Sequence, residues 1–242
     1  MSERDLTFAI LRYNASEQGG KPRLQTFHLK ETPKMTLFIA LNRIREEQDP
    51  SLQFDFVCRE AICGSCGMLV NGKPELACRT LTSKLPNRVT LLPLPGFKLI
   101  GDLSVDTGAW FRAMNERVES WIHTKEAFDP NAQEARMSND TARQVFELER
   151  CIECGCCLAA CTTRLASDGF LGPAGLLRVA RFMADPRDQR TEEQLYDVLG
   201  NEEGIFGCVS LMACDDYCPK DLPLQTQLAY LRRKMLKAGL KT

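Results

Sequence analysis

The sequence lacks the features that carry a chain into or across a membrane. Its 242 residues contain no uninterrupted apolar run of the length that a membrane-spanning helix needs, about 18 residues. The stretch from Met1 to Asp5 also lacks the apolar core of a signal peptide. We therefore expect a cytoplasmic protein with neither a signal peptide nor a membrane span.

Net charge and catalytic motifs are scarce as well. A formal net charge of -1 provides no field that would attract nucleic acid, and no long run of a single charge sign occurs, so we expect no nucleic-acid partner. No glycine-rich nucleotide-binding motif and no acid-base constellation is present. The only histidines, His28 and His123, lie far from the cysteine clusters and are interpreted as ordinary polar side chains.

Cysteine, by contrast, is abundant, with 12 residues. The chain is long enough for one large or two ordinary domains, and its apolar content permits a core that needs no disulfides. In a reducing cytosol, closely clustered cysteines are metal ligands more often than disulfide partners. The composition therefore indicates a metal-binding protein.

Residues 1–105 predict a small sheet crossed by one helix, because alternating apolar positions give way to an i, i+3, i+4, i+7 stripe and then return. The expected elements are a hairpin over residues 1–30 with its turn at 18–22, a helix from Leu37 to Asp49, a hairpin at Asn71-Gly72 between Met68–Val70 and Leu76–Cys78, and a strand over 89–92.

The segment Pro93–Gly96 cannot lie in a central strand, and the pattern becomes helical after it. We expect an α+β fold with a first domain over residues 1–105 and an all-helical second domain over 106–242. The expected helices cover residues 106–121 with Trp110 and Trp121 in the core, the region of Val145, Pro173 to Asp185, Thr191 to Gly200, and the segment after Pro223.

Four cysteines in the first domain have the C-x4-C-x2-C spacing, plus a distant fourth, of a plant-type 2Fe-2S cluster. Three thiolates from one short loop can wrap around the cluster, and Gly64 and Gly67 would let the backbone approach the sulfides and direct amides at them. The predicted ligands are Cys58, Cys63, Cys66 and Cys78.

Two questions stay open at this motif. Zinc also binds four thiolates, but zinc motifs usually present two C-x2-C pairs, and only Cys63 and Cys66 form such a pair. Arg59 and Arg79 each follow a ligand, and both solvated surface charge and contact with a redox partner fit their position.

The second domain carries the two halves of a double-cluster ferredoxin motif, in which the fourth cysteine of each run binds the other cluster. In the second half Leu211 replaces a cysteine, and a cluster corner without a thiolate loses its iron easily. Cys156 falls outside the frame and is interpreted as a buried thiol that binds no iron. The predicted ligands are Cys151, Cys154, Cys157 and Cys218 for a 4Fe-4S cluster, and Cys161, Cys208 and Cys214 for a 3Fe-4S cluster.

Three clusters without catalytic groups indicate a chain that transfers electrons for a partner, and the substrate chemistry and its flavin are then expected on that partner. A freestanding soluble carrier with several clusters is a competing hypothesis. Such carriers usually have a strong surface charge for transient docking, whereas the near-zero net charge here suits a permanent interface. A zinc-stabilised structural protein is the third hypothesis.

With these motifs in hand, the whole chain resembles the iron-sulfur subunits of the succinate dehydrogenase and fumarate reductase family. The stretches that carry the resemblance are Phe54–Arg59, Cys63–Gly67, Leu76–Thr80, Cys151–Cys157, Gly172–Gly175 and Cys218–Lys220. The resemblance implies a plant-type ferredoxin domain of the β-grasp type, a bacterial-ferredoxin-like helical domain, and a place between an FAD-containing catalytic subunit and a membrane-anchor cytochrome b subunit.

Departures from the family pattern bear on the quinone. The segment Thr162–Leu165 lacks the proline that many members of the family have after the cysteine matching Cys161, and it lacks the tryptophan of succinate:ubiquinone enzymes. Val209-Ser210 likewise lacks their histidine, so the ubiquinone-site residues cannot be carried over. The segments Cys154–Cys157, Trp121–His123 and Leu231–Met235 are similar to menaquinol:fumarate reductases with a dihaem anchor. The resemblance thus implies haem b and menaquinone on partner subunits, fumarate reduction with succinate oxidation as the alternative, and a peripheral position on the cytoplasmic side of the cell membrane.

Overall fold

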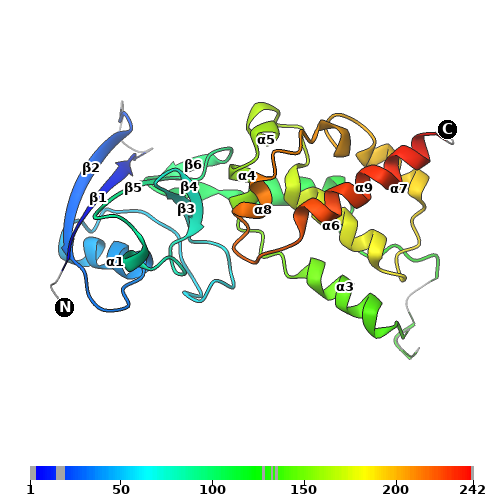
Figure 1. Ribbon diagram of the computed structural model, residues 1–242, viewed down its shortest axis with the longest axis horizontal. Coiled ribbons are helices and arrows are strands. Elements are labelled where there is room, and N and C mark those ends of the chain that lie inside the picture. The colour runs from blue at the N-terminus through cyan, green and yellow to red at the C-terminus, as the bar shows by residue number, and fades with distance from the viewer. Residues whose placement is uncertain (1–3, 15–19, 127–128, 132, 134–135, 241–242) are drawn as a thin grey trace. The chain divides into compact units, whose positions relative to one another are not determined.

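The computed structural model describes residues 4–14, 20–126, 129–131, 133 and 136–240 (Figure 1). The chain forms two compact units, and each is described by itself. The first comprises Met1–Trp110 and Ile152–Ala160, and the second comprises Phe111–Cys151 and Cys161–Thr242.

A mixed five-stranded sheet forms the centre of the first unit, with the strand order β2-β1-β5-β3-β4. Strand β1 pairs antiparallel with β2 and parallel with β5, while β3 pairs antiparallel with β4 and β5. The strands are β1 (Asp5–Arg12), β2 (Arg23–Lys30), β3 (Gly67–Val70), β4 (Lys73–Leu76) and β5 (Arg88–Leu92), and the helical elements are α1 (Leu37–Glu47), η1 (Thr82–Lys84) and α4 (Cys156–Ala159).

The apolar pattern accounts for these elements. The side chains of Leu6, Phe8 and Ile10 in β1 are fully buried, which shows the expected alternation. Helix α1 begins after Thr36, whose hydroxyl accepts the main-chain N–H of Ile39, and its apolar stripe packs into the same core. The two predicted hairpins, the helix and the last strand are confirmed; residues 15–19, which include part of the first predicted turn, lie outside the described residues.

Two details differ from the sequence-based expectation. Strand β4 ends at Leu76, so Ala77 and Cys78 follow it in a turn instead of extending it. A short hairpin of β6 (Lys98–Gly101) and β7 (Ser104–Asp106) was not predicted, because its register is irregular between Leu99 and Gly101 and interrupts the alternation.

A buried ionic network holds the segment that leads into the first cysteine loop. The guanidinium of Arg12 pairs with the carboxylates of Asp102, at 3.0 Å, and of Asp49. Asp102 also accepts the main-chain N–H groups of Tyr13 and Gln53, each at 2.8 Å. Because these partners come from distant parts of the sequence, the network fixes residues 49–53, directly before the aromatic and cysteine residues of the loop.

The second unit contains helices and loops. Helix α6 packs against α3 and α9, and α7 also packs against α9 (Figure 1). The capping box of Thr191 with Gln194 and the proline in the first turn of α6 are present as predicted. The elements are α2 (Thr107–Arg117), α3 (Asn139–Glu149), α5 (Thr162–Ala166), α6 (Gly172–Ala184), α7 (Glu192–Leu199), η2 (Ile205–Gly207), α8 (Ala213–Asp216) and α9 (Leu224–Gly239); α2 begins in the first unit.

The predicted burial of Trp121 is wrong. Helix α2 ends at Arg117, and the chain then turns through Glu119, whose φ is 48°. Trp121 therefore leaves the helical stripe and stacks on the ring of His123, with centroids 5.4 Å apart, while 54% of its surface stays exposed.

Candidate metal centres

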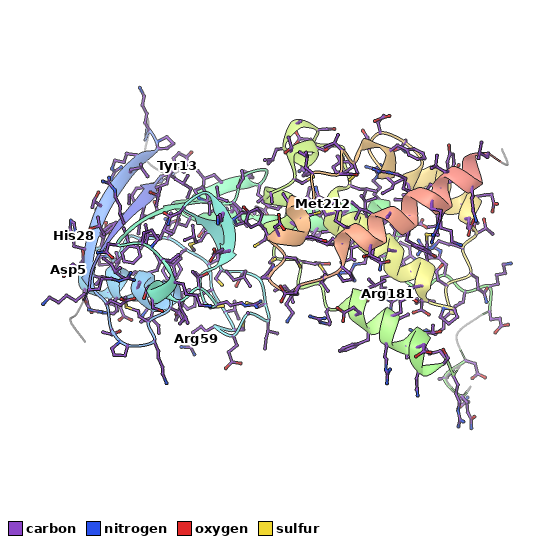
Figure 2. The ribbon with its side chains drawn as sticks, in the orientation of Figure 1. Asp5, Tyr13, His28, Arg59, Arg181 and Met212 are labelled. Carbon is purple, nitrogen blue, oxygen red and sulfur yellow. The ribbon has the colours of Figure 1, made fainter. Side chains whose placement is uncertain are left out.

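The loop of the first cysteine motif turns its main-chain amides toward sulfur. Arg59, labelled in Figure 2, and Ala61 adopt left-handed conformations with φ of 60° and 56°. The resulting amide contacts are those of Glu60, Ile62 and Cys63 to Sγ of Cys58 at 3.4, 3.3 and 3.3 Å, of Cys58 to Sγ of Cys63 at 3.5 Å, and of Ala61 to Sγ of Cys78 at 3.3 Å.

The thiols of this loop differ in how easily they ionise. Burial opposes ionisation of Cys63, but the hydroxyl of Ser65, 3.1 Å from its sulfur, and nearby main-chain N–H groups outweigh it and lower the pKa to about 6. Burial, with the neighbouring thiols of Cys78 and Cys63, raises the pKa of Cys66 to about 12. Ionisation of Cys66 therefore needs a positively charged centre that displaces its proton.

This arrangement fits a 2Fe-2S cluster. A thiolate bound to iron can only accept hydrogen bonds. The loop presents amide donors to Cys58, Cys63 and Cys78, and the main-chain N–H of Cys78 donates to the sulfur of Cys66, so all four predicted ligands have an amide donor. Within the described residues, no group of three or more Cys, His, Asp or Glu side chains is arranged to hold a single metal ion. A cluster with two irons needs its thiolates spread around a larger centre than a single ion does.

Gly64 and Gly67 were expected to let the backbone approach the cluster, and the structure shows what else they admit. A Cβ at Gly64, where φ is 75°, would lie 2.8 Å from Cβ of Cys154 and from the carbonyl oxygen of Ile152. A Cβ at Gly67 would lie 3.1 Å from the carbonyl oxygen of Cys154. Both glycines thus allow the first cysteine loop to pack directly against a predicted ligand of the second cluster.

Cys156 is fully buried in the core of the first unit, as the sequence predicted. A hydrogen bond from its thiol lowers the pKa of Cys154 against the opposing effect of burial. Cys156, which the cluster motif does not use, therefore favours the ionised form of the predicted ligand Cys154. The 4Fe-4S ligand set of Cys151, Cys154, Cys157 and Cys218, all half-buried, stays a prediction from the spacing.

The second unit brings together the three cysteines predicted for the 3Fe-4S cluster. Burial raises the pKa of Cys214 to about 11, and the proximity of Asp215 and Cys161 adds to this effect. Burial also raises the pKa of Cys161, and the proximity of Cys208 contributes, while the main-chain amides of Arg164 and Thr163 donate to the sulfur. Cys161 thus lies close enough to Cys208 and to Cys214 to interact with both electrostatically, which fits the donor set of a cluster.

The connection between Cys208 and Cys214 is an exposed loop. Ser210 and Met212 adopt left-handed conformations with φ of 57° and 64°, and Met212 is labelled in Figure 2. The guanidinium of Arg232 on α9 donates to the carbonyl oxygen of Cys208 at 2.6 Å and to the hydroxyl of Ser210 at 3.2 Å. Leu211 therefore lies on a loop whose start is fixed by hydrogen bonds from Arg232, and 66% of its surface is exposed.

Two residues beside the sulfurs escaped sequence reasoning. Ser65 lies between two predicted ligands, so its hydroxyl could have been noticed from the spacing. The side-chain amide of Gln225 donates to Sγ of Cys214 at 3.3 Å. Because 11 residues separate the two, no local signal in the sequence reveals this contact.

Comparisons with known proteins agree with this geometry. Residues 7–112 match the family described as 2Fe-2S iron-sulfur cluster binding domain, and residues 147–222 match the 4Fe-4S dicluster domain. The chain is 56% identical over 237 residues to the fumarate reductase iron-sulfur subunit of Wolinella succinogenes, covering 98% of this chain and 99% of that protein. It is 37% identical over 237 residues to the succinate dehydrogenase iron-sulfur subunit of Coxiella burnetii, covering 96% and 97%.

A solved structure supports the fold. A chain of the Mycobacterium smegmatis Sdh1 complex in the apo form superposes with a TM-score of 0.86 at 22% identity, covering 98% of this chain and 97% of that chain. Within the part of the chain that the structure describes, every helix is too short or too polar to cross a membrane. Taken with the two cluster-binding domains, these relatives show that the chain belongs to the family of iron-sulfur electron-transfer subunits of fumarate reductase and succinate dehydrogenase.

Proposed function

We propose that this chain relays electrons from a quinol-oxidising membrane anchor to the FAD of a catalytic subunit, in a complex that reduces fumarate to succinate. The observation that carries the direction is the identity of 56% to a fumarate reductase subunit, against 37% and 30% to the succinate dehydrogenase subunits of Coxiella burnetii and Bacillus subtilis. The same role in succinate oxidation is the second candidate, because both kinds of relative match almost the whole chain.

In this proposal the chain contributes ligands and their surroundings. Bound iron-sulfur clusters would accept and release single electrons. The amides of the loop from Cys58 to Cys66 hold the thiolates of the 2Fe-2S centre, whereas Cys161, Cys208 and Cys214 hold the 3Fe-4S centre. We assign the first centre to residues 1–105 and the two other centres to residues 106–242, a division that the matched ranges 7–112 and 147–222 support.

Exposed apolar side chains beside two of the centres support contacts with partner subunits. Val57 and Ile62 flank ligands of the 2Fe-2S centre and are 74% and 61% exposed, and Val209 beside Cys208 is 64% exposed. Apolar surface of this kind suits a permanent interface more than a solvated surface. We assign the 2Fe-2S loop to the FAD subunit and the loop of residues 208–212 to a cytochrome b anchor that carries haem b and menaquinone. This anchor would hold the chain at the cytoplasmic side of the membrane.

The direction of the reaction is tested on the intact complex. This chain would carry an affinity tag, and the complex would be purified anaerobically from detergent-solubilised membranes of its host. We expect FAD and haem to co-purify, and menaquinol-driven fumarate reduction to be faster than succinate-driven quinone reduction. Faster succinate oxidation would favour the second candidate, and a tagged chain that purifies without flavin would contradict the subunit role.

The two interfaces are tested separately with charged substitutions. Ile62→Asp should release the FAD subunit and keep the anchor, and Val209→Asp should do the reverse, because a carboxylate is costly to bury in an apolar contact. Leu24→Asp is the control, since Leu24 is 58% exposed and belongs to β2 and to neither of the two loops. Retention of both partners by both loop variants, with their iron content intact, would contradict the assigned surfaces.

A further inference from the structure

We propose that Gln225 is a positioning residue for the third centre. Its side-chain amide donates a hydrogen bond to the ligand sulfur of Cys214 and thereby raises the reduction potential of the cluster bound there. This inference rests on the proposed ligand set of Cys161, Cys208 and Cys214, and it adds a residue outside every cysteine motif.

Two hydrogen bonds of Gln225 fix its position beside Cys214. Nε2 of Gln225 lies 3.3 Å from Sγ of Cys214, and the main-chain N–H of Gln225 donates to Oδ1 of Asp215 at 3.0 Å. Cys214 and Asp215 both belong to α8, and Gln225 lies in the first turn of α9. The pair of contacts therefore fixes the amide relative to the sulfur, because a rotation of either helix would break one of them.

The chemistry sets the direction of the hydrogen bond. The nitrogen of a glutamine amide can only donate, and a thiolate bound to iron has no proton and can only accept. Donation draws negative charge away from the sulfur, so it stabilises the reduced cluster, which carries one more negative charge, more than the oxidised one.

Burial makes the contact effective. Cys214 is buried and Gln225 is half-buried, so water competes weakly for the amide. The carboxylate of Asp215 opposes the effect, because negative charge beside the cluster disfavours reduction. The main-chain N–H of Gln225 partly compensates this carboxylate, so both contacts of the residue act in the same direction.

The test measures the potential of the third centre in the anaerobically purified complex, by redox titration followed with electron paramagnetic resonance. Gln225→Met and Gln225→Leu retain bulk but remove the donor, and each should lower the equilibrium constant for one-electron reduction about tenfold, or about 59 mV. Gln225→Lys keeps a donor and adds positive charge, so its potential should equal or exceed that of the wild type. Thr226→Met, an exposed neighbour on α9, is the matched control and should leave the potential unchanged.

Each outcome decides one of the two proposals. A wild-type complex without a three-iron signal would contradict the ligand set itself. An intact three-iron signal with the same potential in the Met and Leu variants would overturn the role of Gln225. An equal fall in the Lys variant or in Thr226→Met would also overturn it, because a general disturbance of α9 would then explain the effect. Should one apolar variant fail to assemble, the other apolar variant and the Lys variant still decide the question.

Discussion

Leu211 carries the distinction between a three-iron and a four-iron third centre. It occupies the second position of the frame that Cys208, Cys214 and Cys218 define, and it lies on an exposed loop between two left-handed residues. A leucine side chain offers no donor to iron, whereas a cysteine at this position would complete four thiolates. The exposed surroundings also leave room for a smaller side chain.

The first prediction follows from this position. Leu211→Cys should convert the third centre into a four-iron cluster, so the oxidised-state three-iron signal should disappear and the iron content per chain should rise. Electron paramagnetic resonance and iron analysis of the anaerobic complex check both. Leu211→Ser, which shortens the side chain without adding a thiol, is the control and should keep the three-iron signal; an unchanged signal in the Cys variant would show that the frame is misaligned.

At this scale the sequence predicts ligands better than it predicts their surroundings. The spacing of Cys58, Cys63 and Cys66 identifies a loop around a cluster, because only a few spacings let three thiolates reach one centre. The left-handed conformations of Arg59 and Ala61, which turn the amides toward sulfur, could not be predicted, because neither residue type favours positive φ.

The first cysteine loop and the segment just before α4, which contains Ile152 and Cys154, pack so closely that glycine is required at position 64. Gly64 and Gly72 have similar φ values, 75° and 81°, but a Cβ at Gly72 would meet nothing within 4 Å. The two positions therefore separate the cost of backbone conformation from the cost of contact with Cys154.

The second prediction uses this pair. Gly72→Ala should destabilise the protein by about 1–2 kcal/mol, the cost of a left-handed alanine. Gly64→Ala should cost about 1–3 kcal/mol more through overpacking against Cys154 and Ile152, and should also lower cluster content. Thermal unfolding and iron analysis of the two variants check this, and equal melting temperatures would argue against the close packing.

An ion pair joins α7 to α9. Glu192 in the first turn of α7 accepts a hydrogen bond from Lys234, which raises the pKa of the lysine against the opposing effect of burial. A raised folded-state pKa stabilises the fold fully below the pKa of lysine in the unfolded chain, about 10.4, and the contribution is lost as pH rises through the folded value.

The third prediction follows from that sign. Between about pH 9 and 11.5 the melting temperature of the wild type should fall more steeply than that of Glu192→Gln, because the variant lacks the pair. Asp197→Asn, an exposed site on the same helix, should follow the wild type. Calorimetry over this range checks the difference, and parallel curves for wild type and Glu192→Gln would contradict it.

Elements with strong local signals were predictable, and those that depend on an unusual backbone turn or on an irregular strand pairing were not. Helix α7 has its capping box at Thr191 and its end at Gly200, both visible in the sequence. Trp121 fits the stripe of α2 but lies outside the helix, because the turn at Glu119 and the ring of His123 determine its position. The hairpin of β6 and β7 was missed because its irregular pairing leaves no regular period in the sequence.

For the whole molecule, composition and spacing together restrict the function to electron transfer. Twelve cysteines, two histidines and no nucleotide-binding motif leave ligands for clusters and few groups for substrate chemistry. The structure adds the donors around sulfur and the exposed apolar side chains beside the first and third centres. The chain is therefore best understood as one component of a complex that places its catalytic chemistry on another subunit.

The central claim, that the chain holds one two-iron, one four-iron and one three-iron cluster, is tested most directly by electron paramagnetic resonance of the anaerobic complex. We predict a three-iron signal in the oxidised state, two further species on reduction, and iron and acid-labile sulfide in matching amounts. Zinc in place of iron, or an oxidised state without a three-iron signal, would contradict the account.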